Sequence, residues 1–182
     1  MHNVECKAEL RDLPLARTIC RSLRATPVLS FDQVDTYYRV PHGRLKRRET
    51  EGEPPEWVFY ERANRAAPKL SEFRLYTEEQ ALERFGQGPL PVWVIVRKRR
   101  ELWMHGPVRI HLDTVERLGT FFELEALVSQ EHPIARGHEA VADLRRAFAP
   151  ALGELIDCSY SDLLAREVED DASRESSRDP PS

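Results

Sequence analysis

The chain has 182 residues, which suits one domain with a sizeable core followed by a tail. Its net charge of −4 at pH 7 gives no overall basic field of the kind that indicates bulk nucleic-acid binding. We see no apolar run long enough to span a membrane, no signal peptide and no CxxC spacing among the three cysteines, so we expect a cytoplasmic protein with reduced thiols.

The N-terminal half predicts one helix among several strands. The stretch 3–10 alternates polar and apolar side chains, as a half-buried strand does, so its polar residues share one face. Pro41-His42-Gly43 indicates a turn. The expected elements are strand 3–10, a helix at 13–23, an extended stretch at about 29–40, and strands at about 44–50, 57–62 and 69–76.

The C-terminal half predicts more strands and ends in a tail. From Glu167 onward the composition is charged and rich in Ser and Pro, without apolar anchors, and predicts disorder. We therefore expect one domain over 1–166 and a disordered tail over 167–182. The expected elements are a helix at 78–85 capped by Thr77, strands at about 91–100, 101–105, 107–113 and 120–128, and helices at about 133–150 and 160–166.

The turn lengths favour antiparallel pairing of about eight strands. Hairpin-linked strands with one polar face are typical of a closed barrel or tunnel. The expected fold class is α+β, an eight-stranded antiparallel β-barrel with helices packed outside.

Basic side chains recur at alternate strand positions. A single such residue is normally solvated surface, paired with a nearby Glu. Repeated alternation instead predicts that the faces converge on a cationic cavity, where guanidinium groups match phosphate oxygens. Interior cations would repel one another without an anion, so we expect a polyphosphate to be both ligand and structural partner. The expected binding set is Lys7, Arg39, Arg44, Lys46, Arg48, Arg62, Lys69, Lys98, Arg100 and Arg109.

Four acidic residues are the candidate metal ligands. Glu123 and Glu125 are two apart on one strand and so point the same way, and hard divalent cations prefer carboxylate oxygens. The alternative is that these acids neutralise neighbouring arginines, and Asp113 is also placed to orient an Arg. His111 shares a face with Arg109 and Asp113 and is either a lining or a structural residue. The expected metal set is Glu5, Asp113, Glu123 and Glu125.

Six segments carry a family resemblance. They are NVECKAEL, DTYYRVPHGRLKRRE, FYERAN, VIVRKRRELW, RIHLDTVERLGTFFELE and SYSDLL, and they extend from residue 3 to residue 164. In this order they resemble the CYTH superfamily of triphosphate tunnel metalloenzymes, nearest to class IV adenylate cyclases and thiamine-triphosphatase-like proteins. The family signature Glu-x-Glu-x-Lys reads Asn3-x-Glu5-x-Lys7 here, so Asn replaces the first acid.

The resemblance implies Mg²⁺ or Mn²⁺ as cofactor, Lys7 and Arg109 as catalytic residues, and conversion of ATP to cyclic AMP and pyrophosphate. Hydrolysis of an inorganic or organic triphosphate, or binding of polyphosphate or nucleotide without catalysis, stays open. An RNA-binding module is disfavoured because only Tyr37 and Tyr60 accompany the basic faces. The expected partner is ATP or inorganic triphosphate, with neither membrane nor nucleic acid, and a homodimer is left open.

Overall fold

The computed structural model describes residues 2–61, 69–86 and 88–176, without the side chains at 2, 61, 69–72, 172 and 174–176. The strands are β1 (His2–Leu10), β2 (Thr26–Tyr38), β3 (Arg44–Thr50), β4 (Glu56–Glu61), β5 (Lys69–Tyr76), β6 (Val92–His105), β7 (Val108–Val115), β8 (Gly119–Leu127) and β9 (Leu152–Leu155). The helices are α1 (Leu13–Ser22), α2 (Glu78–Phe85), α3 (Ile134–Phe148), the short 3-10 helix η1 (Ala149–Ala151) and α4 (Tyr160–Ser176).

All nine strands belong to one antiparallel sheet, in the order β5-β4-β3-β2-β6-β7-β8-β1-β9. The sheet curves enough for β5 to pair with β1 as well, with Ser71 opposite Asn3 and Lys69 opposite Glu5. The expected α+β class, an antiparallel sheet with helices outside it, is confirmed.

The structure differs from the expected elements in three places. The two strands expected over 91–105 form the single long strand β6, because β2 pairs with it from Val92 to Met104 and β7 pairs with its second half, from Lys98 to His105. The short strand β9, which pairs with β1, was not expected. The last helix runs to Ser176 instead of Arg166, and the disorder expected over 167–182 stays a prediction. Glu167 and Glu169 have a good helix propensity, and Arg117 pairs with Glu167 and Asp171 on this part of the helix.

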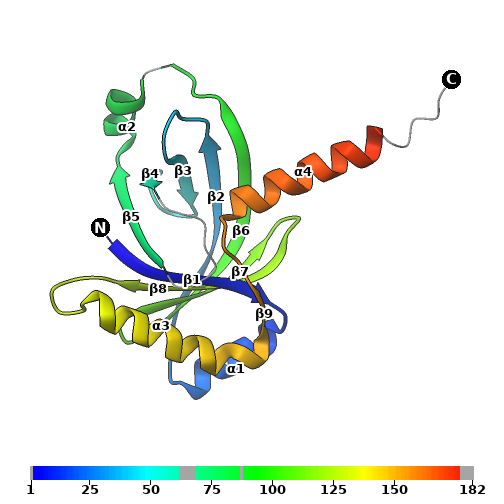
Figure 1. Ribbon diagram of the computed structural model, residues 1–182. Helices are drawn as coiled ribbons and strands as arrows, with labels where there is room; N and C mark the ends of the chain where they lie inside the picture. Colours follow the sequence, from blue (N-terminus) through cyan, green and yellow to red (C-terminus); the bar gives the residue numbers. More distant parts are fainter. Residues whose placement is uncertain (1, 62–68, 87, 177–182) are drawn as a thin grey trace.

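The apolar strand faces pack under helices on the outside of the sheet. Figure 1 shows α1 and α3 side by side against β1 and β8, and the main core lies in this layer, where the ring centres of Phe122 and Phe148 are 4.6 Å apart. A smaller core under α2 contains Leu45, Trp57 and Ala81. Because alternate residues of these strands face the helices, the charged residues between them face the other side of the sheet. Among the described residues, no helix has the length and apolar character needed to cross a membrane.

Candidate functional site

A cavity of about 430 Å³ lies on the concave side of the sheet, and every strand from β1 to β8 contributes to its lining. The sequence-predicted residues that line it are Lys7, Lys46, Arg48, Lys98, Arg100, Arg109, Glu5, Glu123 and Glu125. Asn3, Tyr37, Tyr60, Ser159 and Tyr160 also line it.

Other sequence-predicted residues lie elsewhere. Arg39 is exposed beyond the end of β2 and does not line the cavity. Arg44 turns toward the start of α4, where its Nη1 lies 2.8 Å from Oδ1 of Asp162 and donates to Ser159 Oγ at 2.9 Å. Arg62 and the side chain of Lys69 lie outside the described part of the chain.

The carboxylate of Asp35 is the centre of the cationic side of the cavity. Asp35 lies on β2, is 1% exposed, and is approached by cations from two neighbouring strands. Lys46 Nζ lies 2.9 Å from its Oδ2, Arg48 Nε lies 2.8 Å from its Oδ1, and Lys98 Nζ lies 3.4 Å from Oδ2. One buried acid therefore holds three cations in place.

A second network surrounds Arg100. Its guanidinium donates to both oxygens of Asp113, at 2.7 and 2.6 Å, and also contacts Glu123. The Tyr160 hydroxyl donates to Asp113 at 2.9 Å, and Lys7 Nζ lies 3.8 Å from the centre of the Tyr160 ring and 2.8 Å from Glu123. Both Asp113 oxygens thus accept hydrogen bonds from Arg100, and Asp113 is not among the residues that line the cavity.

Burial and neighbouring charges shift the pKa values of these groups. Burial, together with repulsion from Arg48, lowers the pKa of Lys46 to about 7, although Asp35 partly offsets the change. Burial alone would raise the pKa of Asp35, but Arg48, Lys46 and Lys98 outweigh it and hold that pKa well below the ordinary value. Burial and the charge of Arg100 lower the pKa of Lys98. The Lys46 ammonium can therefore lose its proton near neutral pH.

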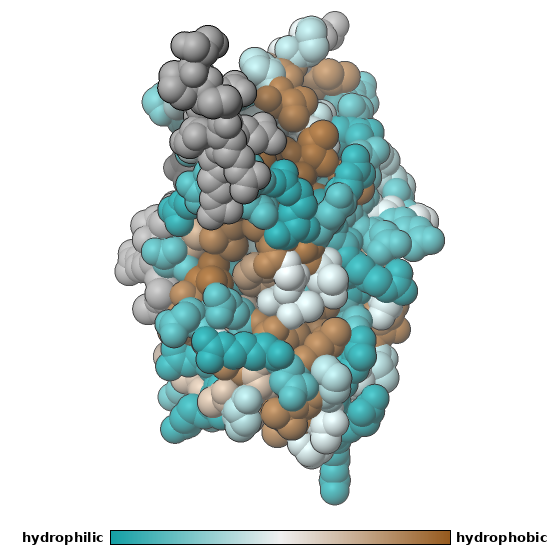
Figure 2. Space-filling model, turned by 90° about the vertical axis from the view of Figure 1, so that its right-hand side faces the viewer, coloured by the Kyte–Doolittle hydropathy of each residue, from teal (hydrophilic) through white to brown (hydrophobic). Residues whose placement is uncertain are grey.

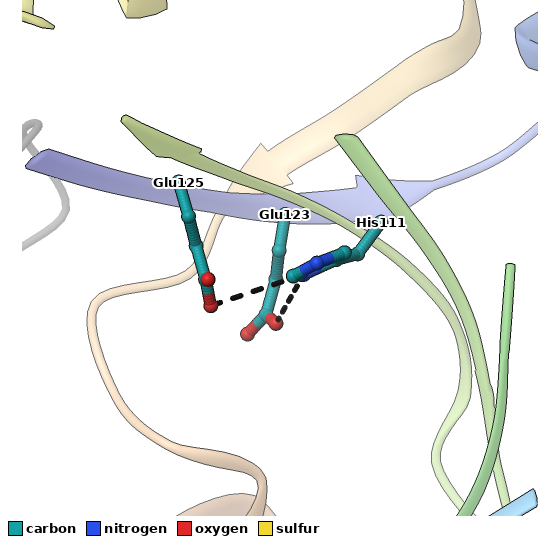
Figure 3. Close-up of side chains that lie close together, drawn as sticks. All are labelled: His111, Glu123 and Glu125. Carbon is teal, nitrogen blue, oxygen red and sulfur yellow. Dashed lines mark ion pairs between the residues drawn. The ribbon is translucent and has the colours of Figure 1, made fainter. Parts of the chain in front are cut away.

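The acidic corner of the cavity follows from the register of β7, β8 and β1. On β8, Glu123 lies between His111 of β7 and Lys7 of β1. Glu125 lies between Arg109 of β7 and Glu5 of β1. Figure 3 shows both carboxylates and the imidazole pointing into the same space.

These side chains have the donor set of a metal site. One ligand atom from each of His111, Glu123 and Glu125 lies within 4.8 Å of the others, and His111 Nδ1 is 3.8 Å from both carboxylates. Within the described part of the chain, His111 Nδ1 and Asn3 Oδ1 are buried and have no hydrogen-bond partner. A buried polar atom without a partner is costly, so these two atoms fit a ligand that supplies the missing contact.

One wall of the cavity is apolar. Apart from Glu56, the described side chains that β4 and β5 present are Val58, Tyr60, Phe73 and Leu75. The cavity therefore has a cationic side, an acidic corner and an aromatic wall, a combination that suits an organic molecule carrying a polyphosphate.

Sequence reasoning missed Asp35 and Tyr160. A signal for Asp35 was present, because strand alternation places it on the same face as Tyr37 and Arg39, both of which were considered for the basic face. Tyr160 had no such signal, because its place depends on where the chain returns after β9.

Comparison with known proteins agrees with this architecture. A family model described as the CYTH domain matches residues 1–153. No curated protein matches the chain. Among solved structures, the PH1012 protein of Pyrococcus horikoshii is 21% identical, with a TM-score of 0.71 over 88% of this chain and 98% of that one.

Two further structures share the fold. An adenylate cyclase candidate from Vibrio parahaemolyticus is 18% identical, with a TM-score of 0.70 over 91% of this chain and 98% of that one. An adenylyl cyclase candidate from Hippeastrum, described as having a dominant triphosphatase activity, is 13% identical, with a TM-score of 0.57 over 91% and 95%. At these identities the likeness concerns the fold, whereas the family model covers most of the sequence: the chain belongs to the CYTH domain family.

Proposed function

We propose that this protein is a divalent-metal-dependent enzyme that acts on a triphosphate held within its curved sheet, in the manner of a class IV adenylate cyclase. In this proposal the eight strands from β1 to β8 form a tunnel, and the pairing of β5 with β1 supports it. The observation that carries it is the single cavity in which six lysines and arginines from four strands meet an acidic corner: Lys7, Lys46, Arg48, Lys98, Arg100 and Arg109.

The cations bind and align the phosphate chain. Lys46, Arg48 and Lys98 form one group around Asp35, and Lys7 and Arg100 form another around Glu123. A chain of three phosphates is long enough to contact both groups, and fixed cations stabilise negative charge without reorganising during the reaction.

Lys7 and Arg109 are the proposed catalytic cations. They lie on β1 and β7, the two strands that flank β8, and therefore stand on either side of the carboxylates of that strand. There they contact the phosphoryl group whose bond to oxygen breaks.

The acidic corner is the proposed metal site. Glu123, Glu125 and Glu5 would hold Mg²⁺ or Mn²⁺, with Asn3 Oδ1 and His111 Nδ1 as neutral donors. A bound dication supplies neutralisation of the charge that develops on the phosphate oxygens. In this assignment Asn3 offers its free oxygen where the family signature has an acid.

The aromatic wall supports an organic triphosphate as substrate. Val58, Tyr60 and Phe73 offer a nucleoside a surface that inorganic triphosphate would not use. In the cyclase reaction the ribose 3′-hydroxyl attacks the α-phosphorus, the bond to the bridging oxygen breaks, and pyrophosphate leaves.

Triphosphate hydrolysis is the second candidate. The same cations and acids serve it, and the described activity of the Hippeastrum structure favours it. The two reactions differ in which phosphorus faces the nucleophile.

A product assay decides between them. The purified protein is incubated with ATP or with tripolyphosphate, with Mg²⁺ or Mn²⁺, and the products are separated by chromatography. Cyclic AMP with pyrophosphate supports the cyclase, and orthophosphate from either substrate supports the hydrolase. No product from either substrate, with tight binding of both, would make the protein a binding protein instead of an enzyme.

Glu125→Gln tests the metal assignment. Glu125 is a cleaner choice than Glu123, because its cationic neighbour Arg109 is 3.9 Å away and half exposed. We expect the variant to need at least about tenfold more metal for half-maximal turnover, the effect typical of a disturbed metal site. Glu139→Gln, an exposed position on α3, is the matched control. An unchanged metal requirement would remove Glu125 from the site.

A further inference from the structure

A second cavity, of about 540 Å³, lies on the opposite face of β4 and β5, beside α2. Phe59 and Arg74 line it and are direct partners across these two strands. Because strand side chains alternate, both point away from the face that carries Val58 and Phe73, which line the first cavity. Among the described lining residues the two cavities share only Tyr60, so β4 is the wall between them.

Arg84 gives the outer cavity its charge. Its guanidinium lies 5.9, 5.5 and 5.6 Å from the ring centres of Phe59, Tyr76 and Phe85. Within the described part of the chain, no carboxylate pairs with Arg84. A guanidinium held against aromatic faces keeps its N–H donors free at its edge, where they can bind an anion.

The loop between β2 and β3 forms the other side of this cavity, through Val40, Pro41 and His42. Gly43 allows the loop to lie close to the ring of Phe59. It has φ of +68°, and a Cβ at this position would lie 2.6 Å from the ring. The wall is therefore built by close contact between the loop and the aromatic cluster.

We propose that this outer cavity binds a small aromatic anion of nucleoside monophosphate size. The anionic group contacts Arg84 and Arg74, and the aromatic group packs against Phe59 and Phe85. The volume is within the range of small-molecule sites, which is about 300–1,000 Å³. Two guanidinium groups that line the same cavity as half-buried aromatic rings complement both parts of such a ligand. This site is separate from the proposed triphosphate site and does not depend on its activity.

AMP is the probe for the test, measured by isothermal titration calorimetry in EDTA with saturating tripolyphosphate in the first cavity. We expect AMP to bind with one site per chain, and adenosine and ribose 5-phosphate each to bind more weakly than AMP. Arg84→Met should weaken AMP binding by at least about tenfold, the effect of losing a charge-assisted hydrogen bond. It should leave tripolyphosphate affinity unchanged. Arg97→Met, at an exposed position on the outside of β6, is the matched control.

Three results would overturn the proposal: no binding of AMP at millimolar concentration, displacement of AMP by tripolyphosphate, or equal AMP affinity in Arg84→Met and the wild type. If Arg84→Met does not fold, Arg84→Lys keeps the charge but loses the planar fork. A loss of AMP affinity in that variant supports the site, and an unchanged affinity contradicts it.

Discussion

Asp35 makes the interior charge of the cavity tolerable before any ligand binds. Three cations converge on its carboxylate, and its own exposure is 1%. Removing one member of a buried charged group leaves the others without compensation, which is much worse than losing a surface ion pair. Asp35 therefore supports the positions of cations that the proposed substrate would contact.

Asp35→Asn should lower the free energy of unfolding by about 3–5 kcal/mol, the range for a broken buried ion pair. The measurement is urea unfolding in phosphate-free buffer. Saturating tripolyphosphate should recover more stability in this variant than in the wild type, because the anion supplies the missing negative charge.

Asp32→Asn is the control for this prediction. Asp32 lies on the same strand and forms an ion pair with Arg99 at 3.3 Å, in which both side chains are exposed. We expect a change of no more than about 1 kcal/mol, as for other surface pairs. Equal losses in the two variants would show that Asp35 has no special part in stability.

Binding of a polyanion should be coupled to proton uptake at Lys46. Its pKa is lowered to about 7 by burial and by Arg48. A bound anion favours the charged form and raises this pKa, so Lys46 gains a proton on binding and the affinity for tripolyphosphate falls as pH rises through about 7. Calorimetry in buffers with different ionisation enthalpies measures the uptake.

Lys46→Arg provides the comparison, because an arginine stays charged throughout this pH range. Titration of tripolyphosphate itself contributes equally in both proteins and cancels in the difference. Equal proton uptake in the variant and the wild type would contradict the assignment to Lys46.

At the scale of the elements, strand alternation predicted which side chains share one face of a strand. The spacing of Lys46 and Arg48, and of Lys98 and Arg100, was enough to place them on one face each, and register then brings these faces to one cavity. Alternation does not show where a strand ends. Arg39 follows the last residue of β2, so the pattern no longer governs its direction.

Contacts between distant parts of the chain could not be predicted in this way. Arg44 has the parity of Lys46, yet it turns to Asp162, more than a hundred residues later. The same return of the chain brings Tyr160 to Asp113. Such pairs depend on the path from β9 to α4, for which the local sequence pattern gives no direction.

The two halves of α4 should contribute very unequally to stability. Its first turns bury Tyr160 and Leu164, whereas beyond Arg166 the helix contributes exposed ion pairs to Arg117. Truncation after Arg166 should lower the melting temperature by no more than about 4 °C, because the two exposed pairs share Arg117 and together contribute about 1 kcal/mol or less.

Truncation after Asp157 is the informative comparison for α4. It removes the buried residues and the partner of Arg44, so a loss well above that of the shorter deletion is expected. Similar melting temperatures for the two truncated proteins, measured by circular dichroism, would mean that the start of α4 is not part of the core.

At the scale of the whole molecule, we expect the interior cations not to depend on an external anion. The sequence suggested that they would, but Asp35, Asp113 and Glu123 already neutralise much of their charge. The protein should therefore be folded in EDTA without phosphate. A molten or unfolded state under those conditions would contradict this reading.

Tripolyphosphate and Mg²⁺ together should stabilise the protein more than either does alone. At a hundredfold excess over the dissociation constant, a ligand adds about 2.7 kcal/mol, which corresponds to a rise in melting temperature of roughly 5–10 °C for a chain of this size. Sulfate at equal ionic strength is the control. Equal shifts with sulfate would indicate a general salt effect.

The carboxylates that neutralise the cavity also set a lower limit on the charge that a ligand must carry. Asp35 and Glu123 already occupy the donors of their cationic neighbours, so an incoming anion has to share those donors or replace the carboxylates. A single phosphate has too little charge to do this at both groups, whereas a chain of three phosphates with a dication can contact both at once. We therefore expect orthophosphate, even in large excess, to compete poorly with polyphosphates for binding in the cavity, because the protein's own carboxylates occupy the cationic donors.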